Sequence, residues 1–250
     1  MDKTKQFQLT VAAGKRLIAK AVLQLEQVKK ALNGHTIVIV SGSTNGYVAE
    51  ELLSQIGQKG NFDKKSFLRG VNTAPGVKVA KGEYSGTDVV IENGVWVKGK
   101  TIFDAAPGLG SDDVILKGAN AVEPDRKLAG IQIANPKLGT SEPILEAVLG
   151  RRTQLIIPVG LEKRVFGSIA EMASRINSPS ASGTRLLPVA GTIITELEAV
   201  QILSGASAEL VAAGGIFGAE GCCWLAVSGS QEQLSAAENV IQSVQKEPAF

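Results

Sequence analysis

A short polar loop separates an apolar run from a helical pattern near the start of the chain. Residues 36–40 are apolar and β-branched, residues 41–46 read SGSTNG, and residues 46–56 have helical spacing. Backbone N–H groups at a helix N-terminus lack intrahelical partners, and the helix dipole adds partial positive charge there. The small and hydroxyl residues therefore predict an anion-binding loop that would suit a phosphate. The candidate anion-binding residues are Ser41, Gly42, Ser43, Thr44 and Asn45.

The same loop also has a purely structural interpretation, because tight turns between a strand and a helix favour Ser, Gly and Asn. It matches neither the G-x-x-x-x-G-K-[ST] motif of Walker nucleotide sites nor the G-x-G-x-x-G motif of dinucleotide sites. Turn chemistry and anion binding both stay open, and the position of the loop at a strand end favours anion binding.

Two later strand ends carry polar side chains. Residues 113–116 are predicted to form a buried strand that leads into Lys117 and Asn120, and the apolar residues 155–159 another that leads into Lys163. Ligands of open parallel sheets bind beyond the carboxyl ends of the strands. We therefore expect Lys117, Asn120 and Lys163 to meet a ligand at the same edge as the polar loop. The alternative is a solvated loop in which Asn120 only makes a turn.

A second helix entry rich in hydroxyl groups follows. Thr140 and Ser141 precede Glu142, and Lys137 stands beside them. We expect Lys137, Thr140 and Ser141 to contact the anion. Glu142 is the candidate general base, with Glu146 one helical turn further on as the other carboxylate. Helix capping by a hydroxyl and a solvated, dipole-compensating Glu142 form the structural alternative.

Alternating strands and helices must position these residues. The remaining pattern predicts a helix over 6–32, a hairpin at 93–94, strands over 131–134 and, more weakly, 66–71 and 77–80, and a helix over 141–150. Strands that alternate with helices indicate an α/β fold with a Rossmann-like, mostly parallel sheet covered on both faces.

A stretch of turn-forming residues, NSPSASG at 177–183, predicts a flexible joint. Beyond it we expect a strand over 186–189, a helix that opens at Thr195, strands over 208–213 and 222–227, and a helix that opens at Ser230. This βαββα order suits a small α+β subdomain of ferredoxin-like type. The chain is therefore expected to form a Rossmann-like α/β domain over 1–177 and the small subdomain over 184–247.

The composition excludes several classes of protein. The 250 residues carry a net charge of +2, and no basic cluster predicts direct binding of nucleic acid. One histidine and two adjacent cysteines exclude a zinc site of familiar spacing, so we expect no metal and no cofactor. No run approaches the roughly 18 apolar residues of a membrane span. With no signal-peptide pattern, the expectation is a cytoplasmic protein without a membrane partner.

The order of these motifs resembles the superfamily of type A ribose-5-phosphate isomerases, glucosamine-6-phosphate deaminases, CoA transferases and the sensor domains of DeoR-type regulators. The resemblance spans residues 5–170. VSGSTNGYVAEELL resembles the isomerase phosphate loop, ILKGANAVEPDRKL resembles a strand end that is acidic in the isomerases, and LIIPVGLEKRV resembles a later strand that ends in a lysine. The segment after these motifs resembles the small α+β domain of the type A isomerases.

The chain differs from that family at the positions where the family has its catalytic residues. Lys117 and Asn120 stand where the resemblance would place carboxylates, and residues 131–146 replace the run that supplies a lysine and the general base. The first hypothesis is therefore a divergent sugar-phosphate isomerase-like or deaminase-like enzyme. In it the 41–46 loop holds the phosphate, Lys117 and Asn120 hold the polar body, and Glu142 is the base.

Two other hypotheses share this scaffold. One is a non-catalytic metabolite sensor that signals through oligomerisation, and the other is a protein that binds or transfers CoA esters. In all three the expected partner is a small phosphorylated or otherwise anionic metabolite, and we expect a homo-oligomer. Because the catalytic positions have changed, binding is expected more firmly than catalysis.

Overall fold

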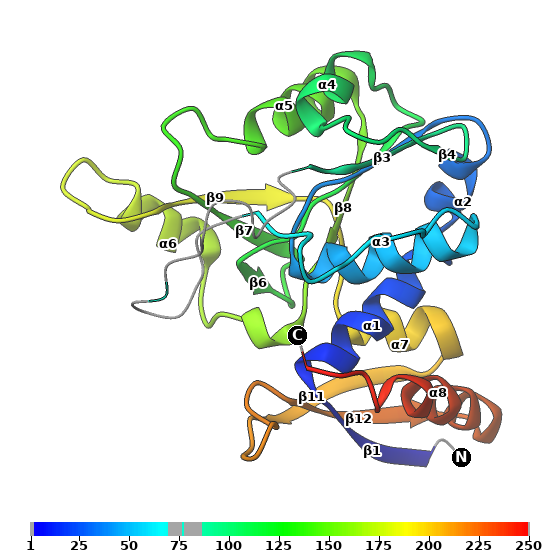
Figure 1. Cartoon of the computed structure of the whole chain (residues 1–250). Coiled ribbons are helices and arrows are strands. Elements are labelled where there is room, and N and C mark those ends of the chain that lie inside the picture. The colour runs from blue at the N-terminus through cyan, green and yellow to red at the C-terminus, as the bar shows by residue number, and fades with distance from the viewer. Residues whose placement is uncertain (1–2, 70–76, 78–86, 250) are drawn as a thin grey trace.

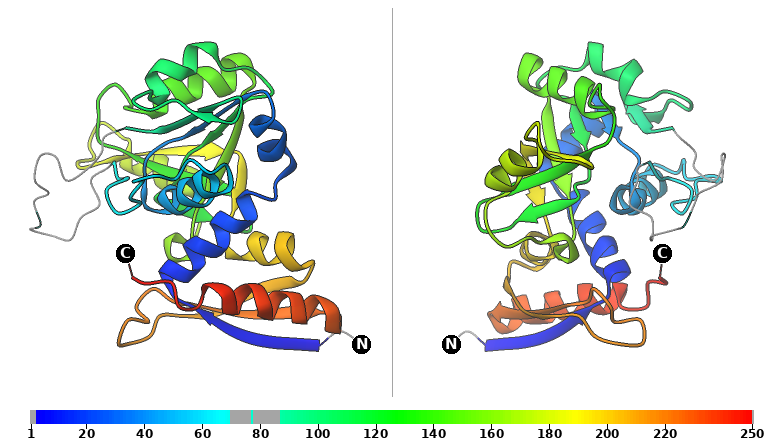
Figure 2. Two further views of the ribbon diagram at one scale, coloured as in Figure 1. Left: turned by 45° about the vertical axis from the view of Figure 1, so that its right-hand side comes forward. Right: turned by 90° about the vertical axis from the view of Figure 1, so that its left-hand side faces the viewer.

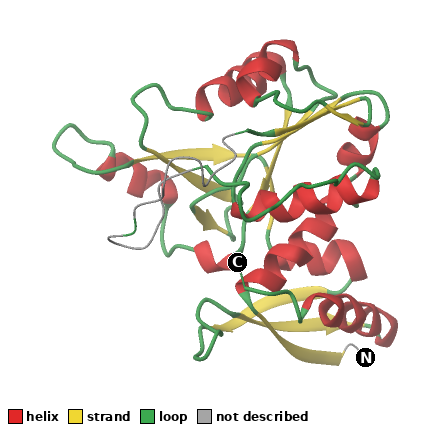
Figure 3. Ribbon diagram, viewed as in Figure 1, coloured by secondary structure: helices red, strands yellow, loops and turns green. Residues whose placement is uncertain are grey.

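Three sheets organise the chain (Figures 1 and 3). The computed structural model describes residues 3–69, 77 and 87–249. The main sheet has six strands, of which the first four in spatial order are parallel. In that order its strands are β10 (Thr192–Ile194), β8 (Gln154–Pro158), β5 (Val114–Leu116), β2 (Thr36–Ile39), β3 (Val89–Glu92) and β4 (Val95–Trp96). The predicted α/β class with a mostly parallel sheet is confirmed.

Helices cover both faces of the main sheet (Figure 1). One face packs against α1 (Val11–Val22), α2 (Glu26–Leu32), α3 (Ser43–Gln55) and α7 (Glu196–Ser204), and the other against α4 (Ile102–Ala105) and α5 (Ser141–Leu145). In β2, Ile37 and Ile39 enter the first core, whereas Val38 enters the second. Side chains alternate across a strand, so a continuous apolar run serves both faces.

Most locally encoded elements are found where they were predicted. The helix after the polar loop is α3, which begins at Ser43, and the predicted helix over 141–150 is α5 followed by a π-helical turn, η2 (Glu146–Gly150). Asn93 and Gly94 join β3 and β4 with positive φ angles of 50° and 75°. The two weaker strand candidates, 66–71 and 77–80, are not strands where the structure describes them. Residues 66–69 and 77 are turn or loop, while 70–71 and 78–80 lie outside the described residues.

The predicted helix over 6–32 is wrong at its start. Residues Lys3–Leu9 form strand β1, which pairs antiparallel with β12 (Cys223–Gly229) along its whole length. Thr10 then starts α1, since its hydroxyl accepts a hydrogen bond from the Ala13 N–H at 3.2 Å. The strand is decided by pairing with a segment more than 200 residues away, which local periodicity does not report.

The second sheet has the order β1-β12-β11 and lies at one end of the molecule (Figure 2). Strand β11 (Ser207–Ala213) and helix α8 (Gln231–Val244) complete this layer together with α7. The predicted helix openings at Thr195 and Ser230 are confirmed, because both form capping boxes, with Glu198 and Gln233.

The third sheet has the order β6-β7-β9 and is antiparallel. Its strands are β6 (Ala121–Glu123), β7 (Leu128–Ile133) and β9 (Arg185–Ala190). The predicted strand over 131–134 belongs to this sheet, not to the main one, and the predicted strand over 186–189 pairs with β7 rather than with β11 or β12. Strands on the two sides of residues 177–183 therefore share sheets, since β10 also pairs with β8.

The remaining short elements are the 3-10 turns η1 (Ala106–Gly108) and η3 (Leu161–Lys163) and helix α6 (Ile169–Ile176). Across the described ranges, the helices are all too short or too polar to cross a membrane.

Candidate functional site

A cavity of about 600 Å³ opens at the carboxyl ends of β2 and β5. Its walls come from the start of α3, the segment after β5, strand β7 and the entry to α5. All of the predicted site residues except two line it: Ser41, Gly42, Ser43, Thr44, Asn45, Lys117, Asn120, Thr140, Ser141 and Lys163. The edge of a parallel sheet thus brings together residues from four separate stretches of sequence, as the strand-end argument predicts.

The polar loop is held in place by buried backbone contacts. The Asp88 carboxylate accepts hydrogen bonds from the N–H groups of Ser41 and Ile102, each at 2.9 Å, and only 2% of Asp88 is exposed. The Gly42 N–H donates to the Phe67 carbonyl at 3.1 Å. Gly42 is the N-cap of α3 and offers no side chain to cap it. The start of this helix is therefore fixed in position with its dipole directed at the cavity.

Hydroxyl groups around the loop divide into two kinds. The Ser43 hydroxyl accepts a hydrogen bond from the Lys15 ammonium at 3.2 Å. The hydroxyls of Ser41 and Thr44 are buried and have no hydrogen-bond partner among the residues that the structure describes. Buried polar groups are normally paired, so two orphaned hydroxyls at a cavity wall are well suited to a polar ligand.

Asn45 has a different task from the one predicted. Its amide nitrogen donates to the carbonyls of Val40 at 2.7 Å and of Leu116 at 2.9 Å. Both of its N–H groups are therefore used to join the ends of β2 and β5, and neither remains for an anion. Asn45 holds the cavity's frame, and only its carbonyl oxygen stays unpartnered within the described part of the chain.

Four cationic side chains line the cavity: Lys15, Arg69, Lys117 and Lys163. No aspartate or glutamate is found among the described lining residues. Arg69 pairs with Asp88 at 3.3 Å, behind the lining. For the side chains of Lys117 and Lys163, the described residues supply neither a hydrogen bond nor an ion pair. The cavity therefore carries excess positive charge, the condition that favours an anionic ligand.

Burial lowers the pKa of two of these lysines. It lowers the pKa of Lys117 to about 8, helped by the positive charges of Arg69 and Lys163 and opposed by Asp88. It also lowers the pKa of Lys15, which Glu162 and Glu196 counteract. Both lysines therefore give up a proton more readily than an exposed lysine does.

A carboxyl group lies behind this lining. Glu196 is buried and accepts a hydrogen bond from the Leu161 N–H at 2.8 Å. Burial, followed by the nearby charge of Glu162, raises the pKa of Glu196 to about 8. A Cβ at Gly14 would lie 2.4 Å from the Glu196 carboxylate, so glycine at this position of α1 leaves room for that carboxylate.

The sequence analysis missed Lys15, Arg69, Asp88 and Glu196. Only Lys15 leaves a recognisable signal, because it stands in α1 among apolar residues yet is 7% exposed. A charged residue on the buried face of a helix is rare unless it has a partner or a role.

The second helix entry brings Thr140 and Ser141 to the cavity wall. Thr140 is the N-cap of α5, but its side chain makes no capping hydrogen bond, and Ser141 is buried at the cavity wall. The amide oxygen of Asn120 accepts the Gln132 N–H at 2.9 Å, so part of its hydrogen-bonding capacity stays within the scaffold.

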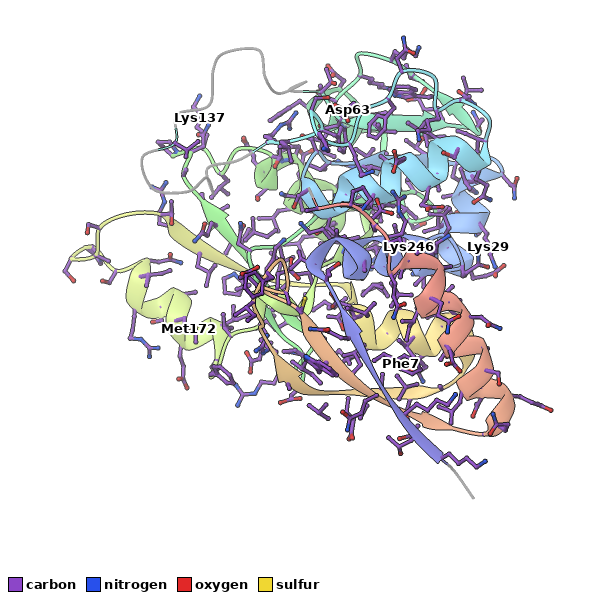
Figure 4. All side chains as sticks on the ribbon, turned by 60° about the horizontal axis from the view of Figure 1, so that its bottom comes forward. Phe7, Lys29, Asp63, Lys137, Met172 and Lys246 are labelled. Atoms are coloured by element: carbon purple, nitrogen blue, oxygen red, sulfur yellow. The ribbon has the colours of Figure 1, made fainter. Side chains whose placement is uncertain are left out.

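Two predicted residues are not brought to the cavity. Glu142 and Lys137 are exposed and are absent from its lining. Figure 4 shows Lys137 at the surface. In α5 the side chain of Glu142 stands in the first turn, where a carboxylate compensates the helix dipole. The geometry therefore favours the structural interpretation of Glu142, a solvated side chain that compensates the helix dipole, over contact with a ligand in this cavity.

The site also contains no evident metal centre: the described residues hold no cluster of three or more His, Cys, Asp or Glu side chains suited to an ion. Comparisons with protein-family models, curated protein sequences and solved structures gave no significant match.

Proposed function

We propose that this chain binds a small phosphorylated or otherwise anionic metabolite in the cavity at the edge of the main sheet. The observation that carries the proposal is the charge of the lining, which has four cations and no described carboxylate. The uncapped start of α3 and the orphaned hydroxyls of Ser41 and Thr44 add donors. Together they match the chemistry by which proteins hold phosphate groups.

A Rossmann-like scaffold related to the sugar-phosphate isomerases, deaminases and DeoR-type sensors is part of this proposal. It is supported by the strand–loop–helix unit of β2 and α3 and by the position of Lys117 directly after β5. Glu142 is exposed and outside the lining, which weakens the particular isomerase mechanism in which it is the base. Binding, with or without a reaction, is the function that the geometry supports best.

The proposal is tested by thermal-shift and calorimetric titration with inorganic phosphate and a panel of sugar phosphates. We expect saturable stabilisation of the protein and a fall in affinity of at least tenfold in Lys117→Met, which is about 1.4 kcal/mol. Ser43→Ala should weaken binding as well. Lys137→Met is the matched control, since it removes one exposed lysine outside the cavity. If the parent, the two cavity variants and the control all bound with the same affinity, the cavity would not be the binding site.

Turnover separates an enzyme from a sensor. Each stabilising compound is incubated with the protein and its conversion followed by NMR. Stabilisation without conversion, accompanied by a ligand-dependent change in oligomeric state, would favour the sensor.

A further inference from the structure

We infer that Lys117 is a nucleophile that forms an imine with the carbonyl group of the bound ligand, so that the cavity accepts an anionic aldehyde or ketone. This inference rests on the proposed function, because the anion site must hold the ligand while Lys117 reacts. Three features of the structure carry it: the fixed backbone of Lys117, the absence of a described partner for its amine, and the charges around it.

The backbone that carries Lys117 is held on both sides. The Lys117 N–H donates to the Ile156 carbonyl of β8 at 3.0 Å. The carbonyl of Leu116, one residue earlier, accepts from the Val40 N–H at 3.0 Å and from the Asn45 amide at 2.9 Å. A nucleophile must be positioned within a fraction of an ångström to react efficiently, and a strand end bonded to two neighbouring strands gives such a fixed origin.

The amine of Lys117 has no competing contact within the described part of the chain. Its side chain is half-buried and lines the cavity, and the described residues offer it no hydrogen bond and no ion pair. Lys15 differs, because its ammonium donates to the Ser43 hydroxyl and lies near Glu162 and Glu196. Such contacts stabilise the charged form of Lys15 and occupy its nitrogen.

The surroundings of Lys117 favour the neutral amine. Burial is the largest effect, the positive charges of Arg69 and Lys163 act in the same direction, and Asp88 opposes them. With a pKa of about 8, about a tenth of the protein carries a neutral amine at pH 7. Desolvation and neighbouring cations are the means by which enzymes activate a lysine toward carbonyl compounds.

The reaction balances without a further reactant. The lone pair of the Lys117 nitrogen forms a bond to the carbonyl carbon, and the carbonyl oxygen takes up a proton to give a carbinolamine. Loss of that oxygen as water then leaves a carbon–nitrogen double bond. One carbonyl group and one amine give one imine and one water, and protonation of the imine nitrogen creates an iminium that withdraws electrons from the neighbouring carbon.

Pyridoxal 5′-phosphate is a suitable probe because it is an aldehyde that carries a phosphate. The full-length protein is incubated with it, borohydride reduces any imine to a stable amine, and peptide mapping by mass spectrometry locates the label. We expect Lys117 to be labelled at least tenfold faster than any other lysine, and tenfold faster by this probe than by pyridoxal, which lacks the phosphate. The rate should rise with pH to a midpoint near 8.

Two variants and one competitor make the outcome decisive. Lys117→Arg retains the positive charge but forms no stable imine, so labelling of this site should disappear, whereas Lys137→Met should label at Lys117 as the parent does. Inorganic phosphate should slow the reaction. If phosphate stabilises the protein but Lys117 is not labelled preferentially, the imine is ruled out and the anion site stands. If phosphate neither stabilises nor protects, the proposed function fails and this inference fails with it.

Discussion

Two groups of cationic side chains in this protein differ in how their charge is balanced. One surrounds Arg16 and joins α1, α3 and the chain after α8, and we refer to its members as the Arg16 cluster: Arg16, Lys64, Glu50, Glu51 and Glu247. The other is the cavity lining, in which Lys117 and Lys163 have no described partner. In the first group every cation pairs with a carboxylate, and in the second no described carboxylate lines the cavity.

The Arg16 cluster uses its charges to hold elements together. The Arg16 guanidinium donates to Glu51 and Glu247, each at 2.9 Å, and to Glu50. It also lies 4.9 Å from the centre of the Tyr47 ring. Burial would lower the pKa of Arg16, but the hydrogen bonds that it donates to Glu247 and Glu50 outweigh that effect and raise it. Buried charge that is satisfied within the protein serves stability, whereas buried charge without a partner is a cost that a ligand can offset.

The largest expected effect is the loss of Arg16. Arg16→Met leaves Glu50, Glu51 and Glu247 without their shared partner, and breaking a buried charge pair costs about 3–5 kcal/mol. Urea denaturation should show that loss in the free energy of unfolding. Lys20→Met is the control, since Lys20 is half-exposed and 3.9 Å from Glu51, and it should change stability by less than ~1 kcal/mol. Equal effects of the two substitutions would contradict the structural role of the cluster.

Acid should break the ion pairs of the Arg16 cluster by protonating Glu50. Burial would raise the pKa of Glu50, but hydrogen bonds from Arg16, Lys59 and Lys64 outweigh it and lower the pKa to about 2. Because the folded-state pKa is depressed, the stabilisation is complete above the unfolded value of 4.5 and is lost as pH falls through 2. The expected loss is about 3 kcal/mol. Unfolding free energies measured from pH 6 to 2 should fall less steeply in Glu50→Gln than in the parent.

Lys117 should also make stability rise with pH, but in the alkaline range. Its folded-state pKa of about 8 lies below the ordinary value of 10.5, so the unfolded chain binds more protons between these values and stability rises with pH there. The gain is at most about 3 kcal/mol. In phosphate-free buffer Lys117→Met should remove the rise and should be as stable as the parent, or more so, at pH 7. A clear loss of stability at pH 7 would mean that Lys117 has a structural partner.

Asp88 sharpens the contrast because it is the carboxylate that pairs with a cavity cation from behind. Asp88→Asn weakens its contacts with Arg69 and with the Ser41 and Ile102 N–H groups, so we expect a loss of about 2 kcal/mol. Thermal unfolding measures it. Asp112→Asn is the matched control, because Asp112 pairs with Lys30 at the exposed surface and its loss should cost less than ~1 kcal/mol.

The smallest expected effect is that of Glu142→Gln. The side chain is exposed and does not line the cavity, so phosphate affinity should stay within about twofold of the parent, or ~0.4 kcal/mol. Titration calorimetry decides this. A tenfold change would return Glu142 to the site and reinstate its predicted role as a base.

Local chemistry explains which features could be predicted from the sequence. Capping boxes at Thr195 and Ser230, the turn at Asn93 and Gly94 and the gathering of strand ends around Lys117 all follow from short stretches and one rule of sheet topology. Each of these signals is contained within a few residues, so a single sequence is sufficient.

Non-local pairing explains the rest. Residues 3–9 form a strand because they pair with β12. Strand β9 was predicted to belong to the small subdomain, but it pairs with β7 instead. The cavity residues missed by the sequence analysis have the same origin. Asp88 contacts the polar loop, and Arg69 contacts Asp88, only after the chain has folded, and no spacing rule connects them to the loop.

The claim that the positively charged cavity lining binds an anion is tested most directly by diffraction from crystals grown with tungstate. This oxyanion mimics phosphate and is located by its anomalous scattering. We expect one dominant tungsten peak inside the cavity, within hydrogen-bond distance of Ser43, Thr44 or Lys117, and the loss of that peak in Lys117→Met crystals. An empty cavity, with tungstate bound only at exposed lysines such as Lys137, would contradict the claim that these cations are there to bind an anion.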